Sequence, residues 1–156
     1  MMCRLKTVGD NEEDIAPNFT LPDVRNGQPV SSAAFRQKKP MGLLLVQDVE
    51  AADRAVQYAS EWFSHFCEAH AVLAVVVRRP VTVDYPEPLL VLMDSNGSVF
   101  EQYECPLDTA VCVYGLDRFG AVVYLASCGA EDLPAVLPRL LDAIELSEMQ
   151  CPECGV

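Results

Sequence analysis

Apolar residues form two kinds of pattern in the first half of the chain. The segments Gly42–Gln47 and Ala71–Val77 are almost continuously apolar, which is typical of strands buried on both faces of a sheet. Between them, over roughly Glu50–Cys67, apolar residues recur at three- and four-residue spacing, which predicts a helix with one buried face. A strand, a helix and a second strand in this order predict a right-handed crossover between parallel strands.

The second half of the chain predicts a short strand, a hairpin and a final helix. Leu89–Met93 has the length and apolarity of a strand, while Ala110–Leu116 and Ala121–Ser127 flank a polar turn, as in a hairpin. The final helix should begin near Asp132, a favourable N-cap residue, and Pro138 should kink or shorten it. Its apolar stripe consists of Leu133, Val136, Leu137, Leu140, Leu141 and Ile144.

Three shorter segments complete the pattern. Val24–Val30 contains Asn-Gly, a strong signal of a tight turn between two strands. Arg78–Pro88 carries three prolines and should be a loop. Val99–Tyr103 is compatible with one helical turn.

Composition narrows the class of protein. A chain of 156 residues has the size of one domain, and no apolar run approaches the roughly 18 residues of a membrane span. The formal net charge of −12 argues against nucleic acid, whose phosphates need Lys and Arg, and against anionic membranes. Seven cysteines, with no apolar signal region behind Met1–Lys6, predict reduced thiols in a cytoplasmic protein.

Two motifs, together with the order of elements, resemble a known family. The segment Ala16–Asp23 reads Ala-Pro-Asn-Phe-Thr-Leu-Pro-Asp, and the turn Leu116–Gly120 reads Leu-Asp-Arg-Phe-Gly. Over about residues 9–148 the chain is similar to the peroxiredoxin and redoxin group of the thioredoxin-fold superfamily. The resemblance implies an α/β, thioredoxin-like fold, with a central mixed β-sheet flanked by helices and an N-terminal β-hairpin. We expect this domain to span residues 1–149, followed by a tail over 150–156.

The resemblance also implies where the two long helices lie. In the thioredoxin fold, the helix after the first core strand and the last helix share one face of the sheet. Both run away from the active-site end. We therefore expect Trp62, Phe63 and Phe66 to be buried against the apolar stripe of the final helix.

The chemistry expected of this family is missing from its usual place. Peroxiredoxins and thioredoxins place a reactive cysteine just after the first core strand, but Asp48–Arg54 contains no cysteine. It contains the carboxylates Asp48, Glu50 and Asp53, which are favoured at the first turn of a helix and would raise the pKa of a nearby thiol. The resemblance therefore predicts a redoxin scaffold without the redoxin nucleophile.

The C-terminal Cys-Pro-Glu-Cys-Gly has three interpretations. Cys151 and Cys154 could form a redox pair, half of a metal site, or two idle thiols in a tail. The fold implied by the resemblance brings the tail near the end of the first helix, where His65, Cys67 and His70 lie. Two tail thiolates, Cys67 and one histidine would make a four-ligand zinc site. No other cofactor is predicted.

Three further cysteines lie in the second half of the chain. Cys105 precedes the penultimate strand, on the loop that faces the reactive turn in redoxins. It is therefore the best substitute for the missing thiol, although no lysine nearby would lower its pKa. Cys112 and Cys128 belong to the predicted hairpin and should behave as small apolar groups.

These observations favour a redox-silent scaffold with a binding or regulatory role. The alternatives are a thiol-disulfide oxidoreductase or antioxidant protein of the peroxiredoxin group that uses Cys151 and Cys154, and a scaffold stabilised by a metal at the tail. The expected partner is a protein or a protein disulfide, and a homodimer is compatible with the sequence. Fold resemblance alone does not decide among these functions.

Overall fold

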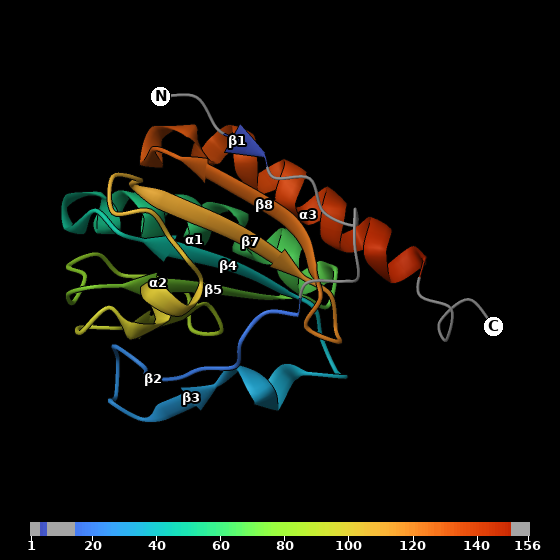
Figure 1. The fold of residues 1–156 in the computed structure, drawn as a ribbon, viewed down its shortest axis with the longest axis horizontal. Coiled ribbons are helices and arrows are strands. Elements are labelled where there is room, and N and C mark those ends of the chain that lie inside the picture. Colours follow the sequence, from blue (N-terminus) through green and yellow to red (C-terminus); the bar gives the residue numbers. More distant parts are fainter. Residues whose placement is uncertain (1–3, 6–14, 151–156) are drawn as a thin grey trace.

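The structure is a computed structural model that describes residues 4–5 and 15–150. A six-stranded sheet forms its centre, with strand order β1-β8-β7-β4-β5-β6 (Figure 1). The strands are β1 (Arg4–Leu5), β4 (Met41–Val46), β5 (Val72–Val77), β6 (Leu90–Met93), β7 (Val111–Leu116) and β8 (Val122–Cys128). β4, β5 and β6 are parallel, whereas β7 runs antiparallel to β4 and β8. The sheet is therefore mixed, and the predicted parallel crossover and the predicted hairpin are both confirmed.

Two long helices cover one face of the sheet. The 3-10 helix η2 (Val49–Ala51) leads into α1 (Ala52–Glu68), and η3 (Ala130–Asp132) leads into α3 (Leu133–Met149). Both long helices run from the end of the sheet where β4 ends toward the opposite end (Figure 1). Their apolar stripes and alternate positions of the strands form one core, as the resemblance implied.

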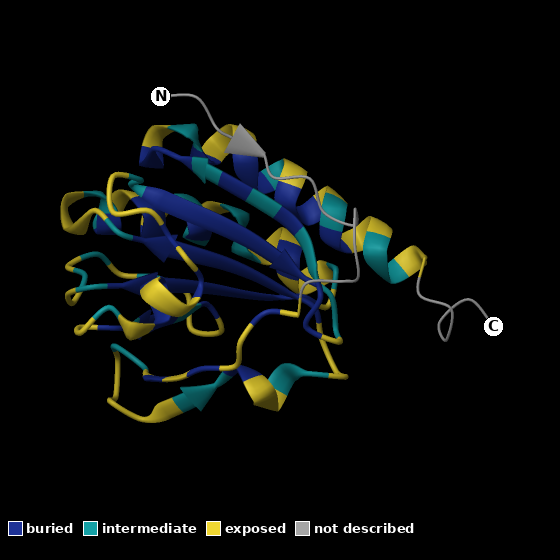
Figure 2. Cartoon of the chain, viewed as in Figure 1, coloured by how far each residue is buried: buried dark blue, intermediate teal, exposed yellow. Residues whose placement is uncertain are grey.

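The other face carries the N-terminal hairpin and a short helix. β2 (Thr20–Pro22) pairs with β3 (Pro29–Ser31) in antiparallel register, and η1 (Ser32–Phe35) follows. Together with α2 (Ser98–Gln102) they cover a second core, formed by the remaining strand positions. Because both faces are covered, β4, β5 and β7 are buried along their whole length (Figure 2).

The packing between the helices follows the prediction in part. Phe66 and the stripe of α3 are buried, whereas Trp62 and Phe63 are only half-buried at the margin of the core. Gly42 of β4 lies where the two helices approach the sheet. A β-carbon there would come within 3.0 Å of Phe66 Cε2 and 3.1 Å of Leu140 Cδ2, so the absence of a side chain allows the close contact.

Pro138 does not shorten the final helix, so that part of the prediction is wrong, and the predicted kink stays a prediction. The residue lies inside α3, which continues from Leu133 to Met149. A proline removes one backbone hydrogen bond of a helix. The burial of Leu140, Leu141 and Ile144, which follow the proline, offsets that loss.

Within the described residues, no helix combines the length and the apolar character needed to cross a membrane.

Candidate functional site at the carboxyl edge of the sheet

The turn after β4 is held against the segment that leads into β7. The N–H groups of Gln47 and Asp48 both donate to the carbonyl oxygen of Ala110, at 2.8 Å and 3.2 Å. In the peroxiredoxins and thioredoxins that the sequence resembles, this turn carries the reactive cysteine. Here it carries Asp48, Val49 and Glu50, and all three are exposed.

Two of the three carboxylates in this region have a structural partner. Asp48 Oδ1 accepts a hydrogen bond from the N–H of Glu50 at 3.0 Å and so caps η2, as expected for an acidic residue at a helix start. Asp53 accepts hydrogen bonds from the hydroxyl and the N–H of Thr82, and these bonds hold the pKa of Asp53 below its usual value. Asp53 thereby ties the loop after β5 to α1, a contact that the sequence patterns did not predict.

An arginine closes the edge between β4 and β5. Arg78 follows β5, and its Nη1 donates to Gln47 Oε1 at 2.7 Å. Its guanidinium also lies over the ring of Phe100, at 5.4 Å from the ring centroid. The side chains at the carboxyl edge are therefore an arginine, an amide and three carboxylates, with no thiol among residues 47–54.

Two cysteines meet behind this edge, in the second core. Cys105 follows α2, where its N–H donates to the carbonyl oxygen of Phe100 at 2.9 Å. Cys112 is in β7, opposite Leu45 of β4 and Ser127 of β8. The thiol of Cys105 donates to the sulfur of Cys112, with the two Sγ atoms 2.7 Å apart.

Sequence patterns missed this pair. Cys112 is buried, as predicted for a small apolar group, but its sulfur contacts a second sulfur rather than hydrocarbon alone. The sequence held one indication of the pair: Cys105 and Cys112 are only seven residues apart, with a turn and the start of a strand between them. Cys128 is also buried, but it belongs to the core on the opposite face.

The two thiols of the pair differ in acidity. The hydrogen bond from Cys105 to Cys112 raises the pKa of the Cys105 thiol, and burial raises it further. The same hydrogen bond lowers the pKa of Cys112 by stabilising its thiolate, and burial opposes that effect. Cys112 is therefore the sulfur that carries the charge when the pair loses one proton, and Cys105 keeps the shared proton.

Two tyrosines line the same core next to the pair. The hydroxyl of Tyr114 donates to the carbonyl oxygen of Tyr103 at 2.6 Å. The hydroxyl of Tyr103 in turn donates to the carbonyl oxygen of Pro17 at 2.7 Å. Their rings meet edge to face, with centroids 5.0 Å apart. Burial raises the pKa of Tyr103 to about 12, so the hydroxyl stays neutral and continues to donate at physiological pH.

The residues proposed for a tail metal site lie at the other end of α1. Cys67 and His70 are exposed, and His65 Nδ1 lies 3.9 Å from a carboxylate oxygen of Glu68. Across residues 4–5 and 15–150, no three His, Cys, Asp or Glu side chains are grouped so as to hold a metal ion. Cys151 and Cys154 lie outside the described residues, so the four-ligand site stays a prediction.

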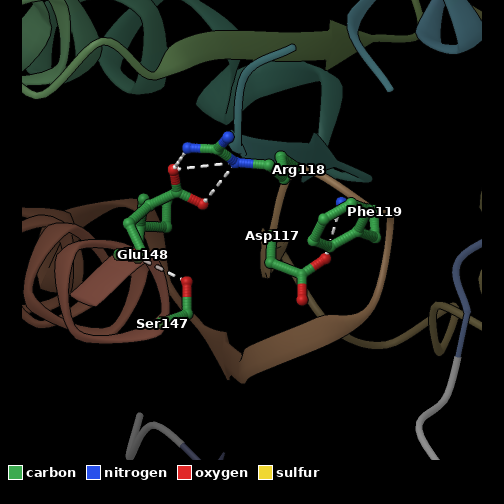
Figure 3. A network of polar contacts seen from close by, with 6 residues as sticks. Asp117, Arg118, Phe119, Ser147 and Glu148 are labelled. Atoms are coloured by element: carbon green, nitrogen blue, oxygen red, sulfur yellow. Dashed lines mark hydrogen bonds and ion pairs between the residues drawn. The ribbon is translucent and has the colours of Figure 1, made fainter. Parts of the chain in front are cut away.

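An ion pair fixes the end of α3 at this far end of the sheet. The Arg118 guanidinium faces the Glu148 carboxylate and binds both of its oxygens, with Nε 3.1 Å from Oε1 and 3.3 Å from Oε2 (Figure 3). Arg118 lies in the β7–β8 turn, which Asp117 also stabilises by accepting a hydrogen bond from the N–H of Phe119 at 2.9 Å. The last turn of α3 is therefore anchored to the β7–β8 turn.

Comparisons with known proteins agree with this architecture. No protein-family model matches the sequence, and no curated protein matches it. The structure is similar to peroxidoxin BcpB from Mycobacterium tuberculosis, with a TM-score of 0.66 and 18% identity over 85% of this chain and 96% of that one. It is also similar to the mitochondrial 2-Cys peroxiredoxin from Plasmodium falciparum, with a TM-score of 0.65 and 14% identity over 90% and 96% of the two chains.

A third solved structure gives the same result. The reduced 2-Cys peroxiredoxin of Plasmodium vivax has a TM-score of 0.64 and 18% identity, covering 87% of this chain and 82% of its own. At these identities the likeness defines the fold. The chain has a thioredoxin-like α/β fold, as predicted, and these solved peroxiredoxins have the same fold.

Proposed function

We propose that this protein is a redoxin-fold scaffold that binds or regulates a protein partner and does not turn over peroxide at the usual redoxin position. The observation that carries the proposal is the turn after β4. It contains carboxylates in place of a thiol, and Asp48 and Asp53 are engaged in holding α1 and the loop after β5. A peroxidase of this fold needs a thiolate as its nucleophile.

The same edge offers apolar contact surface to a protein. Val49, in the turn after β4, is 41% exposed, and Leu107, in the segment before β7, is 88% exposed. Both segments meet at the carbonyl oxygen of Ala110. The proposed partner is a protein, either a different one or a second copy of this chain.

We expect no peroxidase turnover above background when hydrogen peroxide is supplied with dithiothreitol or thioredoxin as the electron donor. The reason is that the accessible turn after β4 lacks a thiolate. The measurement is peroxide consumption over many equivalents of protein, compared with a variant in which all seven cysteines are replaced by serine. Sustained turnover that Cys105→Ser abolishes would contradict the proposal and assign the chemistry to that thiol.

The tail supports a second candidate function, thiol exchange with another protein. α3 has 17 residues and is about 26 Å long at 1.5 Å per residue. It starts at the end of the sheet where β4 ends, because Cys128 pairs with Val111 and Val111 with Val46.

Cys154 is four residues beyond Gln150, and four residues span at most about 14 Å. The tail cysteines therefore do not reach Asp48 of their own chain, and their substrate would be a disulfide in another protein.

We expect Cys151 and Cys154 to be alkylated before the other thiols of the native protein. The physical reason is access, since Cys105, Cys112 and Cys128 are buried and only Cys67 is exposed among the four described cysteines. Alkylation rates mapped by mass spectrometry, with and without a chelator, test this. Tail thiols that react only after a chelator is added indicate zinc ligation, and reversible dithiol–disulfide cycling indicates exchange. Earlier reaction of Cys105, Cys112 or Cys67 in both conditions would contradict a functional tail.

A further inference from the structure

We propose that Cys105 and Cys112 form a second redox site, an intramolecular dithiol that exchanges with small disulfides of the glutathione type. The carrying observation is the 2.7 Å contact between the two sulfurs, which is close to the distance of about 2.05 Å in a disulfide bond. The contact joins the segment after α2, which contains Cys105, to the central strand β7, which contains Cys112. The site uses no residue of the turn after β4 and none of the tail.

The surroundings hold the two sulfurs in this geometry. Cys112 lies in a strand paired on both sides, with β4 and with β8. Cys105 is placed by the hydrogen bond from its N–H to Phe100 at the end of α2. The two sulfurs are already in contact in the dithiol, so little conformational entropy is lost when the disulfide closes.

The exchange balances as two successive displacements at sulfur. Cys105 is 8% exposed and Cys112 1% exposed, so a small disulfide reaches Cys105 first. The pair first loses one proton to solvent, which leaves the charge on Cys112. The Cys105 thiol then passes its proton along the hydrogen bond to the Cys112 thiolate and attacks the small disulfide as a thiolate, which releases one small thiolate and leaves a mixed disulfide on Cys105. Cys112 then gives its proton to that thiolate and attacks the Cys105 sulfur, which releases the second small thiolate; this thiolate takes up the proton that solvent received at the start. Two protein thiols are oxidised, and one small disulfide is reduced to two thiols.

The site can influence the carboxyl edge of the sheet. The segment between the two cysteines contains the exposed Leu107 and also Ala110, whose carbonyl oxygen accepts the N–H groups of Gln47 and Asp48. A disulfide would close this segment into a loop fixed at both ends. Oxidation therefore restricts the same segment that the proposed scaffold presents to a partner.

The test is an equilibrium titration with glutathione and glutathione disulfide on the full chain. Trypsin leaves Cys105 and Cys112 together in one peptide that ends at Arg118 and contains no other cysteine. Formation of the disulfide therefore appears as the loss of two hydrogens and of both alkylation sites in that peptide. The control is the same protein unfolded in urea, in which the sulfurs are no longer held together.

We expect the equilibrium constant for oxidation of the Cys105–Cys112 dithiol by glutathione disulfide to be at least tenfold larger in the native protein than in the urea-unfolded chain. Cys128→Ser, which removes a buried thiol from the opposite face, should leave the native titration unchanged, whereas Cys112→Ser should abolish the disulfide and leave Cys105 as the free thiol or as its unresolved mixed disulfide with glutathione. Two outcomes would overturn the inference: equal constants in the native and unfolded chains, or a native peptide that keeps both alkylation sites or carries only glutathione adducts at every ratio. Both are measured without peroxide, so they are distinguishable from a failure of the proposed scaffold function.

Discussion

Replacing Leu140 with alanine is expected to lower the free energy of unfolding by about 2–5 kcal/mol. Leu140 is fully buried in α3. It also lies against both glycines of the central strands, since a β-carbon at Gly42 or Gly115 would come within about 3 Å of its methyl groups. Alanine would leave a cavity at the point where α3 meets the sheet, and backbone held in two paired strands has little freedom to collapse into it.

The measurement is urea unfolding, monitored by the fluorescence of the single tryptophan, Trp62, and by circular dichroism. Leu146→Ala is the matched control, because Leu146 is in the same helix but is exposed, and it should change stability by no more than about 0.5 kcal/mol. A loss below about 0.5 kcal/mol for Leu140→Ala would show that α3 does not share a core with the sheet.

Replacing Asp94 with alanine is expected to cost about 1–3 kcal/mol, because it leaves buried N–H groups without an acceptor. Asp94 follows β6 and is 2% exposed. Its Oδ2 accepts hydrogen bonds from the N–H groups of Val99 at 2.8 Å and Phe100 at 3.3 Å, and Oδ1 lies 3.4 Å from the hydroxyl of Ser98. These are the first residues of α2, and the first N–H groups of a helix have no acceptor within the helix.

Asp94→Asn is the matched variant for this prediction. Asparagine has nearly the same shape and keeps one carbonyl oxygen, so it can still accept from α2. We expect its loss of stability in urea unfolding to be clearly smaller than that of Asp94→Ala. Equal losses for the two variants would mean that the negative charge, rather than the hydrogen bonds, stabilises α2.

Much of the architecture follows from local patterns, for identifiable reasons. The continuous apolar runs at Met41–Val46 and Val72–Val77 can be satisfied only in strands covered on both faces, and the structure covers them in that way. The periodic stripe that contains Leu140 predicts a helix with one buried face. At the candidate site, the sequence predicted that the usual thiol is missing, because Asp48–Arg54 contains no cysteine in any fold. It also predicted acidic residues at the start of the helix, because capping by Asp48 is a local interaction.

The remaining features depend on elements that are distant in the sequence. Pro138 is a helix breaker by its local preference, yet α3 continues through it because the residues that follow bury their side chains against the sheet. Trp62 and Phe63 have the same periodicity as Phe66, but the position of α3 leaves them at the margin of the core.

Residue type and spacing within single segments were enough to predict the buried strands and the loss of the usual nucleophile, and the family resemblance implied the class of fold. The contact between Cys105 and Cys112 and the hydrogen bonds from Thr82 to Asp53 become visible only in three dimensions. Those contacts depend on the register of β7 between β4 and β8 and on the direction in which the chain leaves β5 and α2. Register and direction are set by packing of the whole sheet, which no local pattern encodes.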